Sequence, residues 1–448
     1  MTKTRKLKIT PMQTIISGYI IIILTGALLL MLPVSTRAGI WTSFEDSLFT
    51  ATSATCVTGL IIHDTFLYWS NFGQIVILTM IQIGGIGFMT LAISAMTFTK
   101  KKIGLRNRYT LQESFNAPQM GGIVKMTRFI LSGTAMLEIS GAILLATRFC
   151  PKYGLWKGLY FAVFHSVSAF CNAGFDLMGD SGEFSSLTEY ESDPVVNLVI
   201  IILIIMGGLG FFVWSDLIKQ KLKFRKLRLH SKIVLVTTAV LIISSFLLIM
   251  LFDQNGPAFE GKNQTQTVLG SLFQAVTPRT AGLNTLDLNL MSDSSIILMI
   301  GLMLIGGSPS STAGGFKTTT LAVLFASIFS EFKRKKSIEA FKRRLSNDVF
   351  VHVICIISLY IFIFSAAAIL ISKIDSIPMK ESLFESASAI GTVGLTLGIT
   401  PGLSGYSHLI LICLMFFGRV GGLTLLLAMR ESRSIDPSQM PVEQITIG

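Results

Sequence analysis

A short segment ending in glycine recurs four times along this chain of 448 residues. The final glycines are separated by 115, 108 and 112 residues, each close to one quarter of the chain. Four copies at a near-constant interval predict a protein built from four similar units. The copies are Ala54–Gly59 (ATCVTG), Ala169–Gly174 (AFCNAG), Thr277–Gly282 (TPRTAG) and Ala389–Gly394 (AIGTVG).

Long apolar segments lie on both sides of every copy, and each has the ~20 residues that a helix needs to cross a bilayer. Each copy ends a half-apolar stretch that is too short to cross and too apolar for a solvated loop, as is typical of re-entrant pore loops. The sequence therefore predicts an all-α integral membrane fold with four M1–pore loop–M2 repeats around a pseudo-fourfold pore. The eight predicted transmembrane helices are 12–33, 73–97, 127–149, 194–217, 232–252, 294–330, 349–372 and 405–429, and the four re-entrant pore helices lie in 41–60, 156–175, 266–284 and 380–396.

Composition supports the membrane assignment. Hydrophobic residues make up 51% of the chain and charged residues only 14%, whereas a soluble domain carries about 25% charged residues. The first apolar segment has no small-residue cleavage site after it, so we interpret it as a span rather than a signal peptide. The five cysteines include no CxxC pair, which argues against a disulfide framework or a zinc site.

The formal net charge of +12 raises the possibility of nucleic-acid binding, but the positions of the charges exclude it. Basic clusters lie at 3–8, 100–108, 219–232, 333–344 and 430–433, all on one side of an eight-span topology. The segment 175–193, on the other side, holds six acidic residues and no lysine or arginine. The positive-inside rule then places both termini in the cytoplasm. The basic loops offer a docking surface or contact anionic lipid headgroups.

These assignments give the predicted domain organisation. It consists of a cytoplasmic N-terminus 1–11, repeat 1 at 12–98, a linker 99–126, repeat 2 at 127–218, a linker 219–231, repeat 3 at 232–333, a linker 334–348, repeat 4 at 349–430 and a cytoplasmic C-terminal tail 431–448.

The recurring segments predict a site for a cation. Four pore helices that point their C-termini at one axis each contribute about half a negative elementary charge. An extended tail after each helix turns carbonyl oxygens inward to replace the ion's hydration shell, and the last tail contains the Thr-Val-Gly core of the potassium-channel filter. We expect K⁺ at the carbonyl groups of Gly59, Gly174, Gly282 and Gly394. The predicted filter residues are Val57, Thr58, Gly59, Asn172, Ala173, Gly174, Thr280, Ala281, Gly282, Thr392, Val393 and Gly394.

Two observations distinguish a filter role for the recurring glycines from a role in helix packing. A polar residue recurs shortly before each tail glycine, at Thr58, Asn172, Thr280 and Thr392, which packing does not require. The later glycine pairs 84–85, 207–208, 306–307 and 421–422 also recur, but glycine in a membrane helix is commonly a packing device. We therefore assign the tail glycines to function and the pairs 84–85 and 421–422 to packing.

The chain resembles the Ktr/Trk/HKT superfamily of potassium transporters, and most of all the KtrB-type membrane subunit. The resemblance spans about 12–430 and is carried by the four repeats and by the motifs TSATCVTGL (52–60), SAFCNAGF (168–175) and FFGRVGGL (416–423). It implies potassium uptake, often sodium-dependent, by a homodimer in the bacterial cell membrane. It also implies a cytosolic ring of KtrA-like or KtrC-like RCK subunits, so that ATP or ADP would act only through that partner and no cofactor would bind this chain.

The sixth predicted helix is interrupted by a ten-residue segment rich in glycine, serine and proline. Irregular backbone at membrane depth survives only where it is buried in protein or lines a cavity. The resemblance assigns such a loop the role of an intramembrane gate; the alternative is a static kink. The gate-loop residues are Gly306, Gly307, Ser308, Pro309, Ser310, Ser311, Thr312, Ala313, Gly314 and Gly315.

Arg419 lies inside the eighth predicted helix, where a charge is costly and needs a partner. We predict that it faces the pore below the filter as a barrier to cations and bonds to carbonyl groups of the gate loop; the alternative is a structural pair elsewhere. Lys317, just after the loop, is expected to snorkel or to face the cytoplasm.

Other charged residues have simpler interpretations. Glu138 is the second intramembrane charge, and we favour a hydrogen-bonded structural role over an ion site. Arg279 is expected to brace the third pore loop. Ser43 with Asp46 resembles a capping box, so Glu45 and Asp46 are expected to stabilise the start of the first pore helix.

Two other classes of function fit the sequence less well. An alternating-access symporter for another solute would need inverted repeats, whereas these four repeats share one orientation. An enzyme would need a catalytic set at membrane depth, and no Ser/His/Asp, HExxH or paired-carboxylate set occurs there. The sequence therefore predicts a gated cation pathway and not an enzyme.

Overall fold

The computed structural model describes residues 10–87, 90, 110, 123–335 and 337–421. The predicted N-terminus, C-terminal tail and first linker lie wholly or largely outside these residues, as do the ends of predicted helices 73–97 and 405–429. The regular secondary structure of the described part is helical except for one hairpin of two-residue strands, β1 (Glu339–Ala340) and β2 (Arg343–Arg344). This confirms the prediction of an all-α class.

Each repeat contains a long first helix, a pore helix and a second helix, in that order. Repeat 1 has α1 (Pro11–Met31), α2 (Phe44–Cys56) and α3 (Asn71–Ile86), and repeat 2 has α6 (Ile123–Tyr153), α7 (Leu155–Cys171), α8 (Pro194–Leu209) and α9 (Phe211–Lys219). Repeat 3 has α10 (Leu229–Asp253), α11 (Gln264–Val276), α12 (Asp293–Leu304) and α13 (Thr318–Phe332), and repeat 4 has α14 (Asn347–Asp375), α15 (Met379–Gly391) and α16 (Gly405–Val420). Short 3₁₀ turns are η1 (Pro33–Ser35), η2 (Gly179–Ser181), η3 (Thr188–Tyr190), η4 (Phe224–Lys226), η5 (Pro257–Phe259), η6 (Leu288–Leu290) and η7 (Thr400–Gly402).

The first helices α1, α6, α10 and α14 are each long and apolar enough to cross a membrane unbroken. Local sequence sets where α1 begins: Pro11 occupies its first turn, and Thr10 and Gln13 form a reciprocal capping box. Such caps satisfy amide groups that lack a partner inside the helix.

The second helices are shorter, and three of the four end at the same type of position. Gly87, Gly210 and Gly421 follow α3, α8 and α16 with φ of +87°, +89° and +89°, a conformation that other residues rarely adopt. At Gly210 the chain turns by 93° into α9, so the predicted helix over 194–217 is bent at this glycine. In repeat 3 the helix stops at Leu304 and resumes at Thr318.

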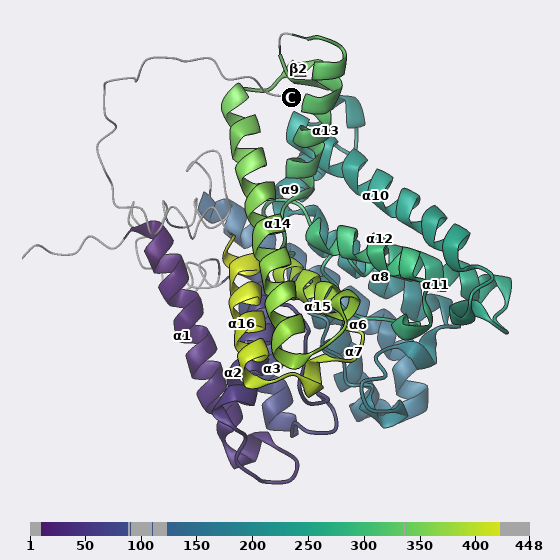
Figure 1. Cartoon of the computed structure of the whole chain (residues 1–448). Coiled ribbons are helices and arrows are strands. Elements are labelled where there is room, and N and C mark those ends of the chain that lie inside the picture. Colours follow the sequence, from purple (N-terminus) through teal and green to yellow (C-terminus); the bar gives the residue numbers. More distant parts are fainter. Residues whose placement is uncertain (1–9, 88–89, 91–109, 111–122, 336, 422–448) are drawn as a thin grey trace, which may run out of the picture.

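The four repeats close into a ring. The second helix of each repeat contacts the pore helix of the next, in the pairs α3–α7, α8–α11, α12–α15 and α16–α2. The last of these contacts joins the two ends of the described chain, and Figure 1 shows the yellow α16 beside the purple α2. The pore helices therefore lie inside a ring that follows chain order.

In repeats 1, 2 and 4 the contact between the second helix and the pore helix of the same repeat requires glycine. A Cβ built on Gly84, Gly207 or Gly418 would lie only 2.0 to 2.1 Å from a carbonyl oxygen near the end of a pore helix. In each case that oxygen belongs to the residue four before a tail glycine: Thr55, Phe170 and Ile390. Our pairing of 421–422 with 84–85 and 207–208 was therefore three residues out of register, because Gly418 occupies the equivalent position.

We predict that Gly207→Ala destabilises the protein by about 2 kcal/mol, because the methyl group forces α8 away from α7. The measurement is the midpoint of thermal unfolding in detergent. Gly301→Ala in α12 is the matched control, since a Cβ there meets no atom within 4 Å, and we expect no loss of stability. Equal midpoints for the two variants would contradict this packing account.

Candidate functional site

The four glycine tails meet in one closed ring. Each tail glycine has a positive φ, between +74° and +97°. A Cβ built on each would lie against the carbonyl oxygen that precedes the glycine of the next tail, so no side chain fits. The contacts are Gly59 with Ala173 (2.6 Å), Gly174 with Ala281 (3.2 Å), Gly282 with Val393 (2.2 Å) and Gly394 with Thr58 (2.2 Å).

Three of the tails begin in the same way. Val57, Asn172 and Thr392 adopt left-handed backbone (φ 59°, 58° and 50°) directly after their pore helices. The amide of each and of its successor bonds back to the last helical turn at 2.8 to 3.2 Å, as in a Schellman cap. Thr280 is also left-handed (φ 74°) but follows an earlier helix end at Val276.

This geometry corrects the register of the polar residues in the tails. The residues at equivalent positions are Val57, Asn172, Thr280 and Thr392, each two before its glycine. Thr58 is one residue later, so our grouping of Thr58 with the other three was wrong. The side chains differ among repeats, and the shared feature is the backbone conformation.

A hydroxyl group braces each tail from its own pore helix, which we did not predict. The Oγ atoms of Ser53 and Ser388 each accept a hydrogen bond from the amide of the tail glycine at 3.0 Å. Ser168 donates to the carbonyl oxygen of Phe175 at 2.5 Å, and Thr277 donates to that of Leu283. The sequence signal was a serine or threonine five or six residues before each tail glycine.

Polar side chains lie beside the ring. Asn172 Nδ2 donates to Thr280 Oγ1 at 3.1 Å, which links tails 2 and 3. The hydroxyl groups of Thr58 and Thr392 are buried and have no hydrogen-bond partner in the described protein. Buried polar atoms normally have partners, so these oxygens are available to an ion or its water.

The interrupted segment of the sixth predicted helix folds back on itself. The amide of Gly306 bonds to the oxygen of Phe316 at 2.9 Å, and that of Phe316 to the oxygen of Leu304 at 3.3 Å. The amide of Thr318 bonds to the oxygen of Gly307 at 3.1 Å. The two ends of the loop therefore lie side by side. The chain leaves the helix after Leu304, forms a compact loop and returns beside its starting point, whereas a kink would only bend the helix.

The loop 306–315 lies against the ring at the place where the pore helices end. Ser308 donates its amide to Gly208 O at 2.9 Å, and Thr312 Oγ1 donates to Phe170 O at 3.2 Å. A Cβ on Gly314 would lie 2.1 Å from Thr392 Oγ1. The loop from repeat 3 therefore touches repeats 2 and 4 next to their glycine tails.

Arg419 joins this loop to repeat 1. Its guanidinium donates to the carbonyl oxygens of Thr312 and Gly84, and to that of Gly85 at 3.1 Å. The predicted bond to a gate-loop carbonyl is therefore present. The bonds to α3 were not predicted. Through them Arg419 acts as a latch, that is, it connects the loop of repeat 3 to α3 of repeat 1.

Lys317 corrects our expectation. Its ammonium group turns back to the loop and donates to Ala313 O at 2.7 Å and Gly314 O at 3.1 Å. Loop carbonyl groups that lack helical partners attract it, a contact that the sequence did not predict. Two cationic side chains therefore hold the loop.

The remaining intramembrane charges have structural partners. Glu138 is buried, and both of its carboxylate oxygens accept from Gln82 Nε2, at 3.1 and 3.0 Å. This agrees with the hydrogen-bonded role that we favoured. Arg279 is 6% exposed and donates to Thr238 Oγ1 at 3.4 Å, so it contacts α10 behind the third tail.

The start of the first pore helix is capped in part as predicted. Ser43 accepts the amide of Asp46 at 3.0 Å. The Asp46 side chain pairs instead with His63 at 3.2 Å, and Glu45 pairs with His408 at 3.0 Å. No cluster of His, Cys, Asp and Glu that could hold a metal occurs among the described residues.

The acidic segment 175–193 is anchored by basic residues from the ends of α6 and α7. Hydrogen bonds from Lys152 and Ser181 hold the pKa of the Glu189 carboxyl below its usual value. Two further ion pairs are Lys157–Asp180 and Arg148–Asp193. These groups are partly exposed, and such pairs contribute about 0 to 1 kcal/mol each.

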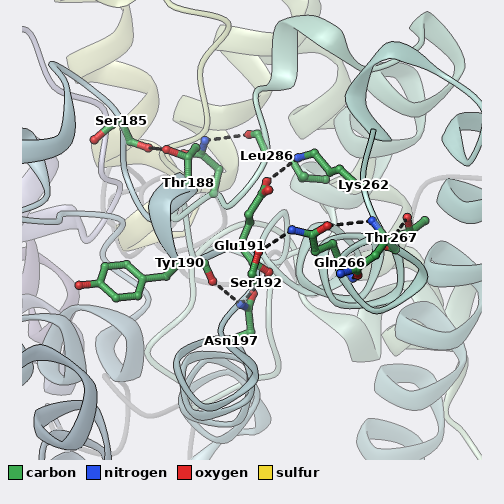
Figure 2. A network of polar contacts seen from close by, with 12 residues as sticks. Ser185, Thr188, Tyr190, Glu191, Ser192, Asn197, Lys262, Gln266, Thr267 and Leu286 are labelled. Carbon is green, nitrogen blue, oxygen red and sulfur yellow. Dashed lines mark hydrogen bonds and ion pairs between the residues drawn. The ribbon is translucent and has the colours of Figure 1, made fainter. Parts of the chain in front are cut away.

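The same segment is joined to repeat 3, as Figure 2 shows. Glu191 pairs with Lys262, and Gln266 Nε2 donates to Ser192 Oγ at 2.6 Å. Asn197 in α8 donates to the backbone of the segment at 2.8 Å. These contacts connect the segment 175–193 of repeat 2 to α8 and to the start of α11 in repeat 3.

Comparisons with known proteins agree with this arrangement. The sequence profile of TrkH, described as a cation transport protein, matches residues 4–438. The chain is 39% identical over 454 residues to the potassium/sodium uptake protein NtpJ of Enterococcus hirae, covering 100% of this chain and 99% of that protein. It is also 39% identical to the Ktr system potassium uptake protein B of Bacillus subtilis, covering 93% and 92%. The solved potassium transporter TrkH from Vibrio parahaemolyticus shares the fold, with a TM-score of 0.74 at 18% identity, over 96% of this chain and 87% of that one.

Proposed function

The chain belongs to the TrkH family of cation transport proteins, and on that premise we propose that it takes up potassium through the ring of its four glycine tails. The family consists of ion transporters and not enzymes. The relatives NtpJ and Ktr system protein B are both named for potassium uptake. The observation that carries the proposal is the closed contact of Gly59, Gly174, Gly282 and Gly394, where no side chain fits.

The chemistry of the ring suits a cation. The pore helices α2, α7 and α15 end directly at their tails and α11 ends a few residues earlier, so their partial negative charges add at one place. Backbone carbonyl groups of the tails replace the hydration shell of the ion. The filter consists of residues 57–59, 172–174, 280–282 and 392–394. It is short because each repeat contributes one glycine.

The repeated contact between each second helix and the next pore helix disfavours the alternating-access symporter. All four contacts run in the same sense around the ring, whereas such symporters commonly rock one repeat against another that is inverted. A single central pathway with a local gate fits the geometry better.

We further propose that the loop 306–315 is the gate, with Arg419 as its latch. The loop lies next to tails 2 and 4 and is joined to repeats 2 and 4 by hydrogen bonds. Such contacts can be exchanged without unfolding a helix. Movement of the loop would therefore open the path from the filter to the cytoplasm.

We expect deletion of Ser308–Ala313 to raise resting potassium flux about tenfold, because the barrier below the filter is removed. The deletion can be closed, since Gly306 and Gly315 lie in contact. Flux is measured in proteoliposomes without a partner subunit. Thr312→Val, which removes only the bond to Phe170, should give a smaller rise. A fall in flux with unchanged elution in size-exclusion chromatography would argue against a gate.

Sodium dependence and partners belong to the same proposal. One relative is named a potassium/sodium uptake protein, and another is named as part of a Ktr system. We propose that sodium stimulates uptake, that the chain forms a homodimer, and that a cytosolic RCK ring confers control by ATP or ADP. The basic segments 219–232 and 333–344 follow α9 and α13, and we place them with both termini in the cytoplasm of a multi-pass cell-membrane protein.

The experiment that tests this function is growth at limiting potassium of a bacterial strain that lacks its own uptake systems. The chain is expressed with and without its cognate cytosolic subunit. We expect rescue of growth, strongest with the subunit and in the presence of sodium. No rescue under any of these conditions, with the protein present in the membrane, would contradict potassium uptake.

A further inference from the structure

Beyond the ring, each of the four tails reaches the solvent at the same place. The residue directly after each tail glycine is at most 1% exposed: Leu60, Phe175, Leu283 and Leu395. The next residue is partly exposed in every repeat, and we call these four the mouth residues: Ile61, Asp176, Asn284 and Thr396. The loop 306–315 contacts tail 4 two residues before its glycine, so the mouth residues lie on the other side of the ring.

The mouth residue of repeat 2, Asp176, is held in place by α7. Ser168 donates its hydroxyl to the carbonyl oxygen of Phe175 at 2.5 Å. The amide of Leu177 donates to Nε2 of His165 at 3.3 Å. The backbone is thus anchored on both sides of Asp176, and its carboxyl group has a fixed position beside the ring.

Two other mouth residues also carry side-chain oxygens. Ser186 Oγ accepts the amide of Asn284 at 3.2 Å and also forms a hydrogen bond with the Asp176 carboxyl, so the mouth residues of repeats 2 and 3 are neighbours. Thr396 carries a hydroxyl group, which donates to Glu385 Oε2 at 2.8 Å. Oxygen atoms are the ligands that hard cations prefer.

Asp176 differs from the other acidic residues of the segment 175–193. Four of the six form ion pairs with a lysine or arginine: Asp180, Glu189, Glu191 and Asp193. Glu183 is exposed. Asp176 is only partly exposed, and no basic side chain among the described residues forms an ion pair with it. Burial, with Asp64 nearby, raises the pKa of its carboxyl to about 7. A carboxylate in such a place is stabilised by a cation from solution.

We propose that Asp176, with the side-chain oxygens of Asn284 and Thr396, forms an outer cation site that captures potassium before it enters the glycine ring. A negative group at the end of a narrow path raises the local concentration of cations, and acidic side chains serve this purpose in cation channels. The inference rests on the proposed uptake function. It adds a residue that sets the affinity of uptake rather than its maximal rate.

The test is the rate of potassium uptake as a function of external potassium, at about pH 8, where the carboxyl is mostly ionised. The full chain is expressed in a bacterial strain that lacks its own potassium uptake systems. Asp176→Asn keeps an oxygen that can accept the amide of Met178 but removes the charge. We expect KM to rise about tenfold while the maximal rate stays within about twofold, because capture is weakened and the ring is intact.

Two further variants separate charge from structure. Asp176→Glu keeps the charge, and its KM should stay close to that of the wild type. Asn284→Lys places a positive charge beside Asp176 and should raise KM at least about tenfold. Because it leaves Asp176 in place, it keeps the inference testable if Asp176→Asn fails to assemble.

Matched controls change the charge by the same amount at exposed positions of the same two loops. Glu183→Gln removes a negative charge, and Asn289→Lys adds a positive one. Both should keep the wild-type KM. An effect of general surface charge would instead raise KM in the controls as much as in the mouth variants.

The inference would be overturned by an unchanged KM in Asp176→Asn or Asn284→Lys with the variant present in the membrane. An equal rise in Asp176→Glu, or in the matched controls, would overturn it as well. None of these results would affect the assignment of the ring as the filter. Absence of potassium uptake by the wild-type chain would instead contradict the proposed function itself, so the two failures are distinguishable.

Discussion

Replacing Gly394 with serine is expected to reduce the ratio of potassium to sodium flux by at least about tenfold. A Cβ at this position would lie 2.2 Å from Thr58 O and 2.9 Å from the Cα of Gly59. The residue also has a φ of +95°, which strains any side chain. The variant must widen the ring between tails 4 and 1, and a wider ring no longer replaces the hydration shell of potassium.

Gly398→Ser is the matched control for backbone strain. Gly398 has a similar φ of +91°, but a Cβ there meets no atom within 4 Å. We expect this variant to keep wild-type selectivity. Unchanged selectivity in Gly394→Ser, in a protein that still folds and transports, would rule out the assignment of this ring as the filter.

Replacing Arg419 with alanine is expected to raise resting potassium flux about tenfold. The guanidinium bonds to Thr312 in the loop and to Gly84 and Gly85 in α3, so its removal frees the loop from repeat 1. It also removes a positive charge from the path that we propose for the ion. Flux into proteoliposomes without the cytosolic subunit measures this effect.

Arg419→Lys separates the latch from the charge. Lysine keeps the positive charge but lacks the planar fork that reaches several carbonyl oxygens at once. We expect it to leak, though less than the alanine variant, because the latch is broken while the charge remains. Unchanged flux in Arg419→Ala would show that Arg419 is not a barrier.

Much of this architecture could be predicted from the sequence because it depends on local composition and spacing. The tail glycines recur near a quarter of the chain length, and apolar segments of spanning length flank each of them. The interruption between Leu304 and Thr318 was visible because glycine, serine and proline do not continue a helix. The cost of a charge at membrane depth predicted that Arg419 needs a partner.

The errors concern register and distant contacts. Thr58 was grouped with Asn172 because both are polar, whereas the fold places Val57 at that position through its left-handed backbone. Gly418 was missed because the sequence pair 421–422 looked more like the other pairs. The type of a side chain does not determine which backbone conformation or helix position its residue takes.

Other features had no sequence signal. Glu45 and His408 are 363 residues apart and meet only because the ring closes. Lys317 turns back to the loop because its carbonyl groups lie free, which depends on the folded shape of that loop. Such contacts are consequences of the closed fourfold arrangement and could be found only in the structure.

The central claim is that the ring of Gly59, Gly174, Gly282 and Gly394 selects potassium. The most direct measurement is the flux of potassium and of sodium through the purified full chain in proteoliposomes, for the wild type and for Gly394→Ser side by side. The account predicts a wild-type ratio well above one that collapses toward one in the variant. Equal ratios in the two proteins, or a wild-type chain that moves sodium as fast as potassium, would contradict it.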